Sequence, residues 1–292
     1  LVARVRELPR PGETALGGSL RTFTGGKGAN QAVAAARLGG RVAMVGRVGR
    51  DAGGDALVGQ LERDGVDVAG VARDDEEPTG TALIMVDRRG ENLIAVTSGA
   101  NGRVGAADVD RALRALEPDG LLVLQLEIPV EAAALAIRRG RRVLLNAAPA
   151  AALDRDLLRG VEVLLVNESE AGALLGRPVA DATAGMEAAW ALHAAGARLA
   201  VVTLGAAGSA LCDAGGPRRV EPFPVETVDT TAAGDAFAGA LAVGLAAGLP
   251  AGAAARLASA AGAAAASREG AQASLPTAAD LARMFGVQAP EP

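Results

Sequence analysis

A polar turn of small residues leads into an apolar helical stretch in Val228-Asp229-Thr230-Thr231-Ala232-Ala233-Gly234-Asp235-Ala236-Phe237-Ala238-Gly239-Ala240-Leu241. Gly234 and Asp235 fall in the first turn of the predicted helix. Backbone N–H groups there have no partner inside the helix and the helix dipole is positive, so this turn favours an anion. An anion site beside a carboxylate base is what phosphoryl transfer to a hydroxyl requires. The plainer alternative is that Asp235 only caps the helix.

The single lysine of the sequence, Lys27, lies within Gly25-Gly26-Lys27-Gly28-Ala29-Asn30-Gln31, whereas the other 28 basic residues are arginine. Arginine is a planar fork and lysine is a compact ammonium on a flexible stem. A lone lysine between glycines therefore indicates a binding loop that accepts a point cation. The alternative is that one lysine was kept by chance.

Composition favours one large globular domain. The chain has 292 residues, half of them hydrophobic, and a chain of this size removes roughly 75% of its unfolded surface from water. A net charge of −5 with scattered arginines argues against a nucleic-acid-binding surface. No apolar run reaches membrane-spanning length and no signal-peptide pattern is present. With Cys212 as the only cysteine, we expect a cytoplasmic protein.

The scarcity of histidine and tyrosine limits the possible chemistry. His193 is the only histidine, no tyrosine is present, and the residues around His193 predict an ordinary helix end. Any general base is therefore expected to be Asp or Glu, and a zinc site lacks its usual ligands. A P-loop is excluded because Arg21 and Gly28 occupy its required Gly and Ser/Thr positions. No G-x-G-x-x-G follows a strand, so a dinucleotide site has no support.

Strand-like apolar runs alternate with Ala/Leu-rich helical stretches, which predicts an α/β fold: a doubly wound, mostly parallel sheet with helices on both faces. The predicted strands are 42–48, 121–126, 143–146, 161–167 and 199–204. The predicted helices are about 54–63, 130–139, 186–195, 234–247, 252–267 and 278–285. Ligands on such sheets bind outside the carboxyl ends of the strands, where the sequence places Gln125, Glu127, Asn146, Asn167 and Thr203.

Two regions interrupt this alternation. Residues 1–24 are strand-like with scattered glycines, and residues 81–87 and 92–98 predict a hairpin around Arg88-Arg89-Gly90. We expect a small antiparallel lid, drawn from about 1–24 and 79–100, within a single domain of residues 1–292. A lid with apolar edges favours pairing with a second copy, so we expect a homodimer.

Two further strand ends carry residues suited to a hydrated metal ion and to phosphate. Asn167 and Glu170 could hold hydrated Mg²⁺, which takes few carboxylates and keeps several waters; a helix capping box explains the same pattern equally well. In Thr203-Leu204-Gly205-Ala206-Ala207-Gly208 a strand runs into a glycine turn whose N–H groups could hold phosphate. A plain hairpin turn is the alternative.

Together these segments resemble the ribokinase branch of the phosphofructokinase-B-type carbohydrate kinases. Residues 25–34 resemble the family's sugar signature and residues 229–235 its catalytic signature. Between and after them, in family order, come Leu126-Glu127, Asn146-Ala147-Ala148-Pro149-Ala150, Asn167-Glu168-Ser169-Glu170-Ala171, Thr203-Leu204-Gly205 and Gly270-Ala271-Gln272-Ala273-Ser274. The likeness covers nearly the whole chain and implies ATP-dependent phosphorylation of the 5-hydroxyl of ribose.

The resemblance also implies roles for individual residues. Asp235 matches the base, and Ala233 and Gly234 match the anion hole for the transferring phosphoryl group. The matches to sugar-binding positions are Gly26, Lys27, Gly28, Ala29, Asn30 and Glu127. The matches to ATP-binding positions are Asn167, Thr203, Leu204, Gly205, Ala206, Ala207, Gly208, Gly234 and Ser259. Asn167 and Glu170 match the Mg²⁺ motif, with contact expected through water. The matches to a monovalent-cation site, usually filled by K⁺, are Asp229, Thr231, Ala265, Arg268, Gly270 and Ser274.

The sequence departs from this family at its start. Family members open with a strand ending in Gly-Ser-x-Asn-x-Asp, whose Asp holds the sugar hydroxyls, whereas this sequence starts at Leu1, where that run would have finished. We therefore expect exposed sheet edges and one missing sugar contact. The rival functions are another sugar or nucleoside kinase of the same family and a non-catalytic sugar- or nucleotide-binding protein. An unrelated α/β oxidoreductase is a third rival.

Overall fold

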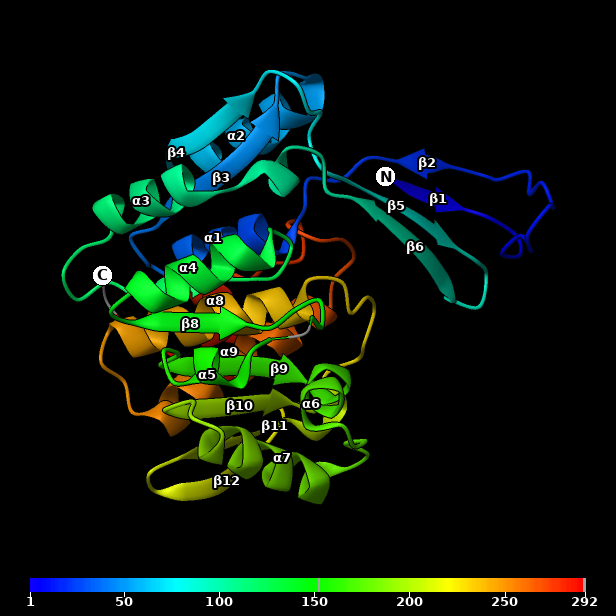
Figure 1. Ribbon diagram of the computed structural model, residues 1–292. Coiled ribbons are helices and arrows are strands. Elements are labelled where there is room, and N and C mark those ends of the chain that lie inside the picture. Colours follow the sequence, from blue (N-terminus) through cyan, green and yellow to red (C-terminus); the bar gives the residue numbers. More distant parts are fainter. Residues whose placement is uncertain (152, 291–292) are drawn as a thin grey trace.

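Helices enclose both faces of a six-stranded sheet in the computed structural model, which describes residues 1–151 and 153–290 (Figure 1). The strand order is β12-β11-β10-β9-β8-β7. The four parallel strands are β7 (Leu122–Leu124), β8 (Val143–Asn146), β9 (Val163–Asn167) and β10 (Leu199–Thr203). The hairpin of β11 (Ser209–Asp213) and β12 (Gly216–Val220) continues the sheet antiparallel. The predicted domain range of 1–292 also includes residues 152, 291 and 292, which lie outside the described residues.

Side chains of the central strands alternate between two hydrophobic cores, as the period of two in a β-strand requires. In β9, Val163 and Leu165 join one core, while Leu164 and Val166 join the other. The first core is covered by α1 (Lys27–Arg37), α8 (Ala233–Ala246), α9 (Ala251–Ala266) and α10 (Ala278–Phe285). The second is covered by α4 (Val130–Arg139), α5 (Arg155–Leu158), α6 (Glu168–Leu175) and α7 (Ala182–Ala194). The predicted sheet with helices on both faces is confirmed.

Two parallel strands form a separate sheet beside this body: β3 (Ala43–Gly49) and β4 (Asp67–Asp74), joined by α2 (Ala52–Arg63). The 3-10 helix η1 (Gly99–Arg103) and α3 (Ala106–Ala115) follow the lid and pack near this pair. Within the described residues, β3 pairs only with β4 and β7 pairs only with β8. Residues of β3 and β7 line the same cavity. The expected unpaired sheet edges are therefore present on β3 and β7, and both strands border the same cavity.

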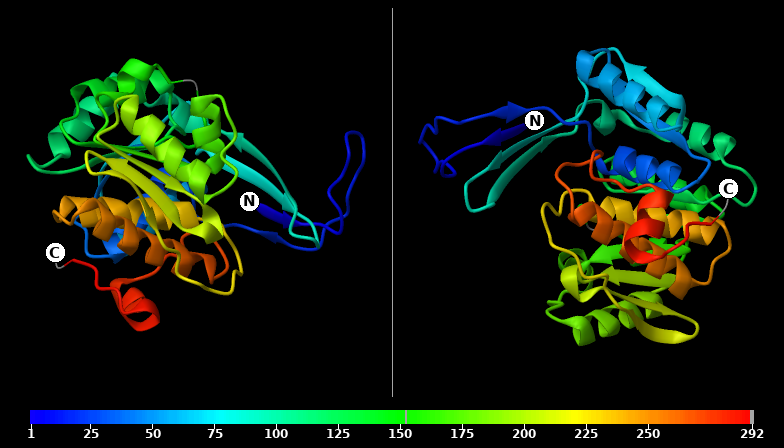
Figure 2. Two further views of the ribbon diagram at one scale, coloured as in Figure 1. Left: turned by 90° about the horizontal axis from the view of Figure 1, so that it is seen from below. Right: turned by 180° about the vertical axis from the view of Figure 1, so that it is seen from behind.

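The lid is a four-stranded sheet that projects from the body (Figures 1 and 2). Its order is β2-β1-β5-β6. The strands are β1 (Val2–Arg4), β2 (Leu20–Arg21), β5 (Thr81–Val86) and β6 (Asn92–Thr97). The predicted hairpin is confirmed, but β1 pairs with β5 in parallel, so the lid is not purely antiparallel. Residues 1–24 contain only five strand residues, because residues 5–19 between β1 and β2 form no strand.

The central strands and the C-terminal helices follow the predictions closely, whereas other elements were missed. The hairpin β11–β12, strand β4 and helix α3 were not predicted. The interpretation of residues 27–31 as a loop is wrong, because helix α1 begins at Lys27. Small residues and glycines there indicated a loop, but packing of this segment against α8 makes it helical. Among the residues that the structure describes, every helix is too short or too polar to cross a bilayer.

Helices α1 and α8 approach each other unusually closely at Gly239. A Cβ atom at Gly239 would lie 2.7 Å from the Cβ of Ala34, 2.7 Å from the carbonyl oxygen of Gln31 and 2.9 Å from the amide nitrogen of Ala35. Two of these three atoms belong to the backbone and cannot move aside separately from the helix. A residue without a side chain at position 239 therefore sets the distance between the two helices.

We predict that Gly239→Ala destabilises the fold by about 1–3 kcal/mol, the usual cost of overpacking a core. The matched control is Gly252→Ala in α9, where an added Cβ meets no atom within 4 Å. That change should be neutral or stabilising by up to about 1 kcal/mol, because alanine has the higher helix propensity. Urea unfolding measures both. Equal stabilities for the two variants would contradict the close approach.

Candidate active site

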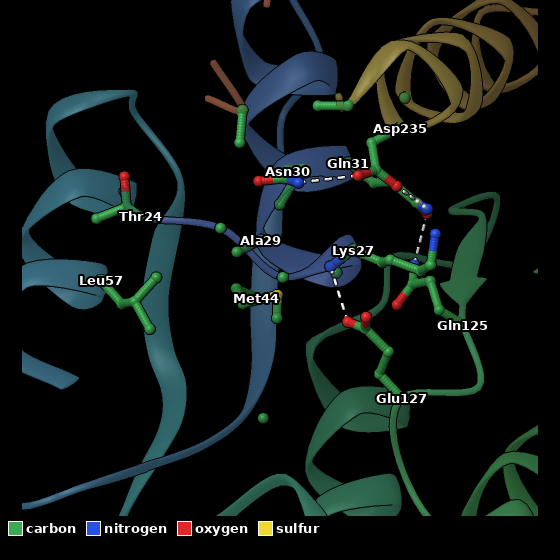
Figure 3. A pocket seen from close by; sticks show the side chains of 18 of the residues that line it. Thr24, Lys27, Ala29, Asn30, Gln31, Met44, Leu57, Gln125, Glu127 and Asp235 are labelled. Carbon is green, nitrogen blue, oxygen red and sulfur yellow. Dashed lines mark hydrogen bonds between the residues drawn. The ribbon is translucent and has the colours of Figure 1, made fainter. Parts of the chain in front are cut away.

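A cavity of about 2570 Å³ lies between the lid, strands β3 and β7, and the starts of α1 and α8. Lys27 and Asp235 both line it, although more than 200 residues separate them in the sequence. Figure 3 shows Asn30, Gln31, Gln125 and Glu127 around the same space. The sequence expectation that an acidic residue and the lone lysine share one cleft is therefore confirmed.

The sugar signature forms the first turns of α1. Gly26 caps this helix with φ of 95°, a left-handed conformation that a residue with a side chain rarely adopts. The N–H of Lys27 donates to Glu127 Oε2 at 2.8 Å. Glu127 thus accepts one of the N–H groups that have no partner inside the helix. The positive end of the helix dipole at this N-terminus stabilises the negative charge of Glu127. The loop after β7 is thereby fixed to the start of α1.

Asp235 lies in the first turn of α8 and is 7% exposed. Its Oδ2 accepts a hydrogen bond from the side-chain amide of Asn30 at 2.8 Å, and its Oδ1 accepts one from the amide of Gln31 at 3.0 Å. Both oxygens are therefore held by α1, and the hydrogen bonds give no support to the alternative that Asp235 only caps its own helix. The Oδ1 of Asn30 is buried and accepts no hydrogen bond within residues 1–151 and 153–290.

Three amide side chains near Asp235 complete this arrangement. Gln31 also contacts Asn146 at the end of β8 and Gln125 after β7. The sequence placed Gln125 and Asn146 at strand ends but gave Gln31 no role. The signal was present, because Gln31 directly follows Asn30 in the sugar signature, but only the helical turn of α1 shows that both side chains reach the same carboxylate.

The backbone at the start of α8 is strained, since Ala232 has φ of 60° and is the only non-glycine residue with positive φ in the described part of the chain. The N–H of Ala233 donates to the carbonyl of Thr230 at 3.2 Å. Neither Gly234 nor Asp235 uses its N–H in a hydrogen bond within the described residues. Of the two predicted anion-hole donors, Gly234 is free to bind an anion and Ala233 is already engaged.

Asn167 and Glu170 form the capping box of α6: each side chain accepts the backbone N–H of the other, at 2.8 and 2.9 Å. Burial raises the pKa of the Glu170 carboxyl; the N–H of Asn167 and the charge of Lys27 act in the opposite direction, and the charge of Asp235 adds to the rise. Glu170, Lys27 and Asp235 therefore share one electrostatic environment. Within the described residues, no group of three or more His, Cys, Asp or Glu gathers to hold a metal ion.

The predicted nucleotide segment is a tight connection between β10 and β11. The 3-10 helix η2 (Gly205–Ala207) follows β10, and the N–H of Leu204 donates to the carbonyl of Gly208 at 2.9 Å. Leu204 is 3% exposed, so its side chain belongs to the core. Thr203 pairs in register with Asn167. The turn 203–208 and Ser259 on α9 lie outside the cavity that Lys27 and Asp235 share, and the hydroxyl of Ser259 is buried without a partner in the described residues.

The predicted cation-site residues form one connected region between the start of α8 and the end of α9. The carboxylate of Asp229 accepts the N–H of Thr231 and the N–H of Gly270, both at 2.9 Å. Burial opposes ionisation of Asp229, but the hydrogen bonds from Thr231 and Gly270 outweigh it and lower the pKa of this carboxyl. The N–H of Asp229 donates to the carbonyl of Ala266, the neighbour of Ala265.

Two of the other predicted cation-site residues, Arg268 and Ser274, have side chains that are already occupied. The guanidinium of Arg268 forms an ion pair with Asp280 of α10, at 3.0 Å. The hydroxyl of Ser274 is buried and donates to the carbonyl of Ala271 at 2.8 Å. Only the carbonyl of Arg268, and not its side chain, could therefore face a cation.

Residues 1–278 match the model of the pfkB family carbohydrate kinase. The chain is 37% identical to the ribokinase of Haemophilus influenzae over 280 residues, covering 94% of this chain and 92% of that protein. It is 39% identical to the ribokinase of Schizosaccharomyces pombe over 302 residues, covering 99% and 95%. The solved structure of Arabidopsis thaliana ribokinase, complexed with ribose and ATP, is similar with a TM-score of 0.86 and 31% identity, covering 97% and 94%.

Proposed function

The chain belongs to the pfkB family of carbohydrate kinases, and we propose that it phosphorylates the 5-hydroxyl of D-ribose with ATP, giving ribose 5-phosphate and ADP. The observation that carries this proposal is the placement of Asp235: a buried carboxylate at a helix start, in the cavity that also holds Lys27 and Asn30. Near-full-length similarity to ribokinases, one of them solved with ribose and ATP, supports the choice of substrates.

In the proposed reaction, Asp235 accepts the proton of the sugar hydroxyl as the sugar oxygen attacks the γ-phosphorus. The bond between the γ-phosphorus and its bridging oxygen breaks, and ADP leaves. The free N–H of Gly234 and the ammonium of Lys27 offset the negative charge that the transferring group carries. The Oδ1 of Asn30 has no partner among the described residues and is an acceptor for a sugar hydroxyl, which fits a polyhydroxylated ligand. Glu127 and residues 26–29 would line the sugar site.

We further propose that Mg²⁺ and K⁺ assist this reaction. The Asn167 and Glu170 oxygens each accept one N–H bond and keep a second lone pair, which suits a metal ion held largely through water. Mg²⁺ would neutralise charge on the β- and γ-phosphates. The turn 203–208 and Ser259 would bind ATP. Carbonyl oxygens around Asp229 offer the all-oxygen donors that K⁺ takes. We also place the protein in the cytoplasm, where ATP is available.

A homodimer through the lid is the remaining part of the proposal. The strand register places Leu20, Ala3, Met85 and Leu93 in one row across all four lid strands. Leu20 is 69% exposed and Leu93 is 51% exposed. The opposite face carries Val2, Ile84 and Ile94, which line the cavity. An apolar sheet face turned away from the active site suits a second copy of the same lid.

We predict that Asp235→Asn lowers turnover of ribose and ATP by about 10²–10⁴-fold, the usual contribution of a general base. The control is Asp181→Asn, which changes the N-cap of α7, where asparagine caps equally well. A coupled ADP-release assay with ribose, deoxyribose, fructose and adenosine identifies the substrate. Near-normal turnover of Asp235→Asn would refute the base assignment. ATP binding by calorimetry without ADP release from any sugar would instead support a binding protein.

We predict that K⁺ raises turnover relative to Na⁺ at equal ionic strength, by about 5–150-fold, the usual range for coupling between sites. Asp229→Ala should remove most of this difference, because it releases Thr231 and Gly270. Steady-state rates in K⁺, Na⁺ and tetramethylammonium measure the effect. Equal rates in all three buffers for the unaltered protein would contradict the cation site.

We predict that Leu93→Glu converts a dimer into a monomer in sedimentation velocity experiments, because it places a charge in the apolar lid row. Trp190→Glu is the matched control, since Trp190 is 58% exposed on α7, away from the lid. It should leave the dimer intact. A monomeric unaltered protein, or a dimeric Leu93→Glu variant, would rule out assembly through this face.

A further inference from the structure

Gln31 uses the full hydrogen-bonding capacity of its amide nitrogen inside the protein. The side chain is 2% exposed. Its Nε2 donates to Asp235 Oδ1 at 3.0 Å and to Asn146 Oδ1 at 2.9 Å, and its Oε1 accepts from Gln125 Nε2 at 2.6 Å. Both N–H bonds of the amide are therefore engaged, one of them with the carboxylate of Asp235.

The orientation of the Gln31 amide is fixed by a chain of hydrogen bonds that begins at a backbone carbonyl. Asn146 Nδ2 donates to the carbonyl of Leu165 in β9 at 3.2 Å. A carbonyl can only accept, so the nitrogen of Asn146 must face Leu165 and its oxygen must face Gln31. The nitrogen of Gln31 then faces Asn146 and Asp235, and its oxygen faces Gln125. The sheet thus determines which end of the Gln31 amide meets Asp235.

This chain connects four elements to one carboxylate. Gln31 comes from α1, Asn146 from the end of β8, Gln125 from the segment after β7 and Asp235 from α8. Asn30, which like Gln31 belongs to the sugar signature, holds the second oxygen of Asp235. Gln31 has a different position: its partners are Asp235 and two other amides, and its orientation depends on the sheet.

We propose that Gln31 is a positioning residue that holds the plane of the Asp235 carboxylate in its reactive orientation before substrate binds; this inference rests on the proposed role of Asp235 as the base. A carboxylate anchored at both oxygens has a fixed direction for its remaining lone pairs, and one of these must accept the sugar proton. Loss of the Gln31 bond frees Oδ1 and lets the carboxylate rotate about the remaining bond to Asn30. Misplacement of a reacting group by about 1 Å can reduce a rate by about 10²-fold.

The test is Gln31→Met, which keeps the length of the side chain and removes its hydrogen bonds. We expect kcat to fall by about 10–100-fold, with little change in the KM for the sugar. The matched control is Gln60→Met. Gln60 also donates an amide N–H to a carboxylate, that of Asp64, at 2.6 Å, but it lies on α2 outside the cavity. Its loss should leave kcat unchanged. A kcat of Gln31→Met within twofold of the unaltered protein overturns the proposal.

A double-mutant cycle separates positioning from a general structural role. If Gln31 acts through the carboxylate of Asp235, adding Gln31→Met to Asp235→Asn should lower kcat by less than about twofold, because the group it positions is already lost. The proposal is overturned if Gln31→Met lowers kcat by the same factor in both backgrounds. It is also overturned if a lower melting temperature accounts for the whole loss of kcat. If Gln31→Met does not fold, Gln125→Met frees the Oε1 of Gln31 and should lower kcat in the same direction, whereas an unchanged kcat overturns it.

A crystal structure of ligand-free Gln31→Met tests the proposal independently of activity. We expect the Asp235 carboxylate to turn away from its present orientation or to occupy two orientations. An unchanged, singly occupied carboxylate overturns the proposal. If the unaltered protein phosphorylates no sugar in the panel, the proposed function fails, while this structure still decides whether Gln31 positions Asp235.

Discussion

The close approach of α1 and α8 at Gly239 is the constraint on which the site depends. Because no side chain separates the helices there, the backbone of Gln31 lies against α8 about one turn after Asp235. The side chains of Asn30 and Gln31 can then reach both oxygens of Asp235. A wider separation would leave a buried carboxylate without partners, which is costly. Packing geometry and electrostatic stabilisation of the site therefore have a common origin.

The carboxyl edge of the parallel sheet supplies the rest of the site. Gln125, Asn146, Asn167 and Thr203 follow or end four successive strands, β7 to β10. The first two contact the Gln31 amide, and the latter two lie toward the turn 203–208. One sheet edge thus extends from the cavity containing Asp235 to the segment proposed to bind ATP. The lid stands over the cavity end of this edge, with one apolar face toward the cavity and the other toward solvent.

Charges in this region are few and mutually dependent. Burial raises the pKa of the Glu170 carboxyl, the charge of Lys27 opposes this rise, and the charge of Asp235 adds to it. Glu127 caps α1 immediately beside Lys27. The composition already indicated that the base is a carboxylate, because the sequence has one lysine, one histidine and no tyrosine. In the same way, Asp229 ties the segment before α8 to Gly270 after α9 through backbone N–H groups.

The sequence by itself determined where the central strands and helices follow one another along the chain, because apolar runs and helical periodicity are local properties. It also singled out Lys27, Asp235 and Asn167 as candidate site residues, through motifs whose residues are neighbours in the chain. Only the tertiary structure decided that residues 27–31 are helical, that β1 pairs in parallel with β5, and that Asn167 and Glu170 cap α6 together. It alone showed that Gln31 meets Asp235. These outcomes depend on contacts between segments far apart in sequence, and no local pattern encodes the distance between two helices that a single glycine sets.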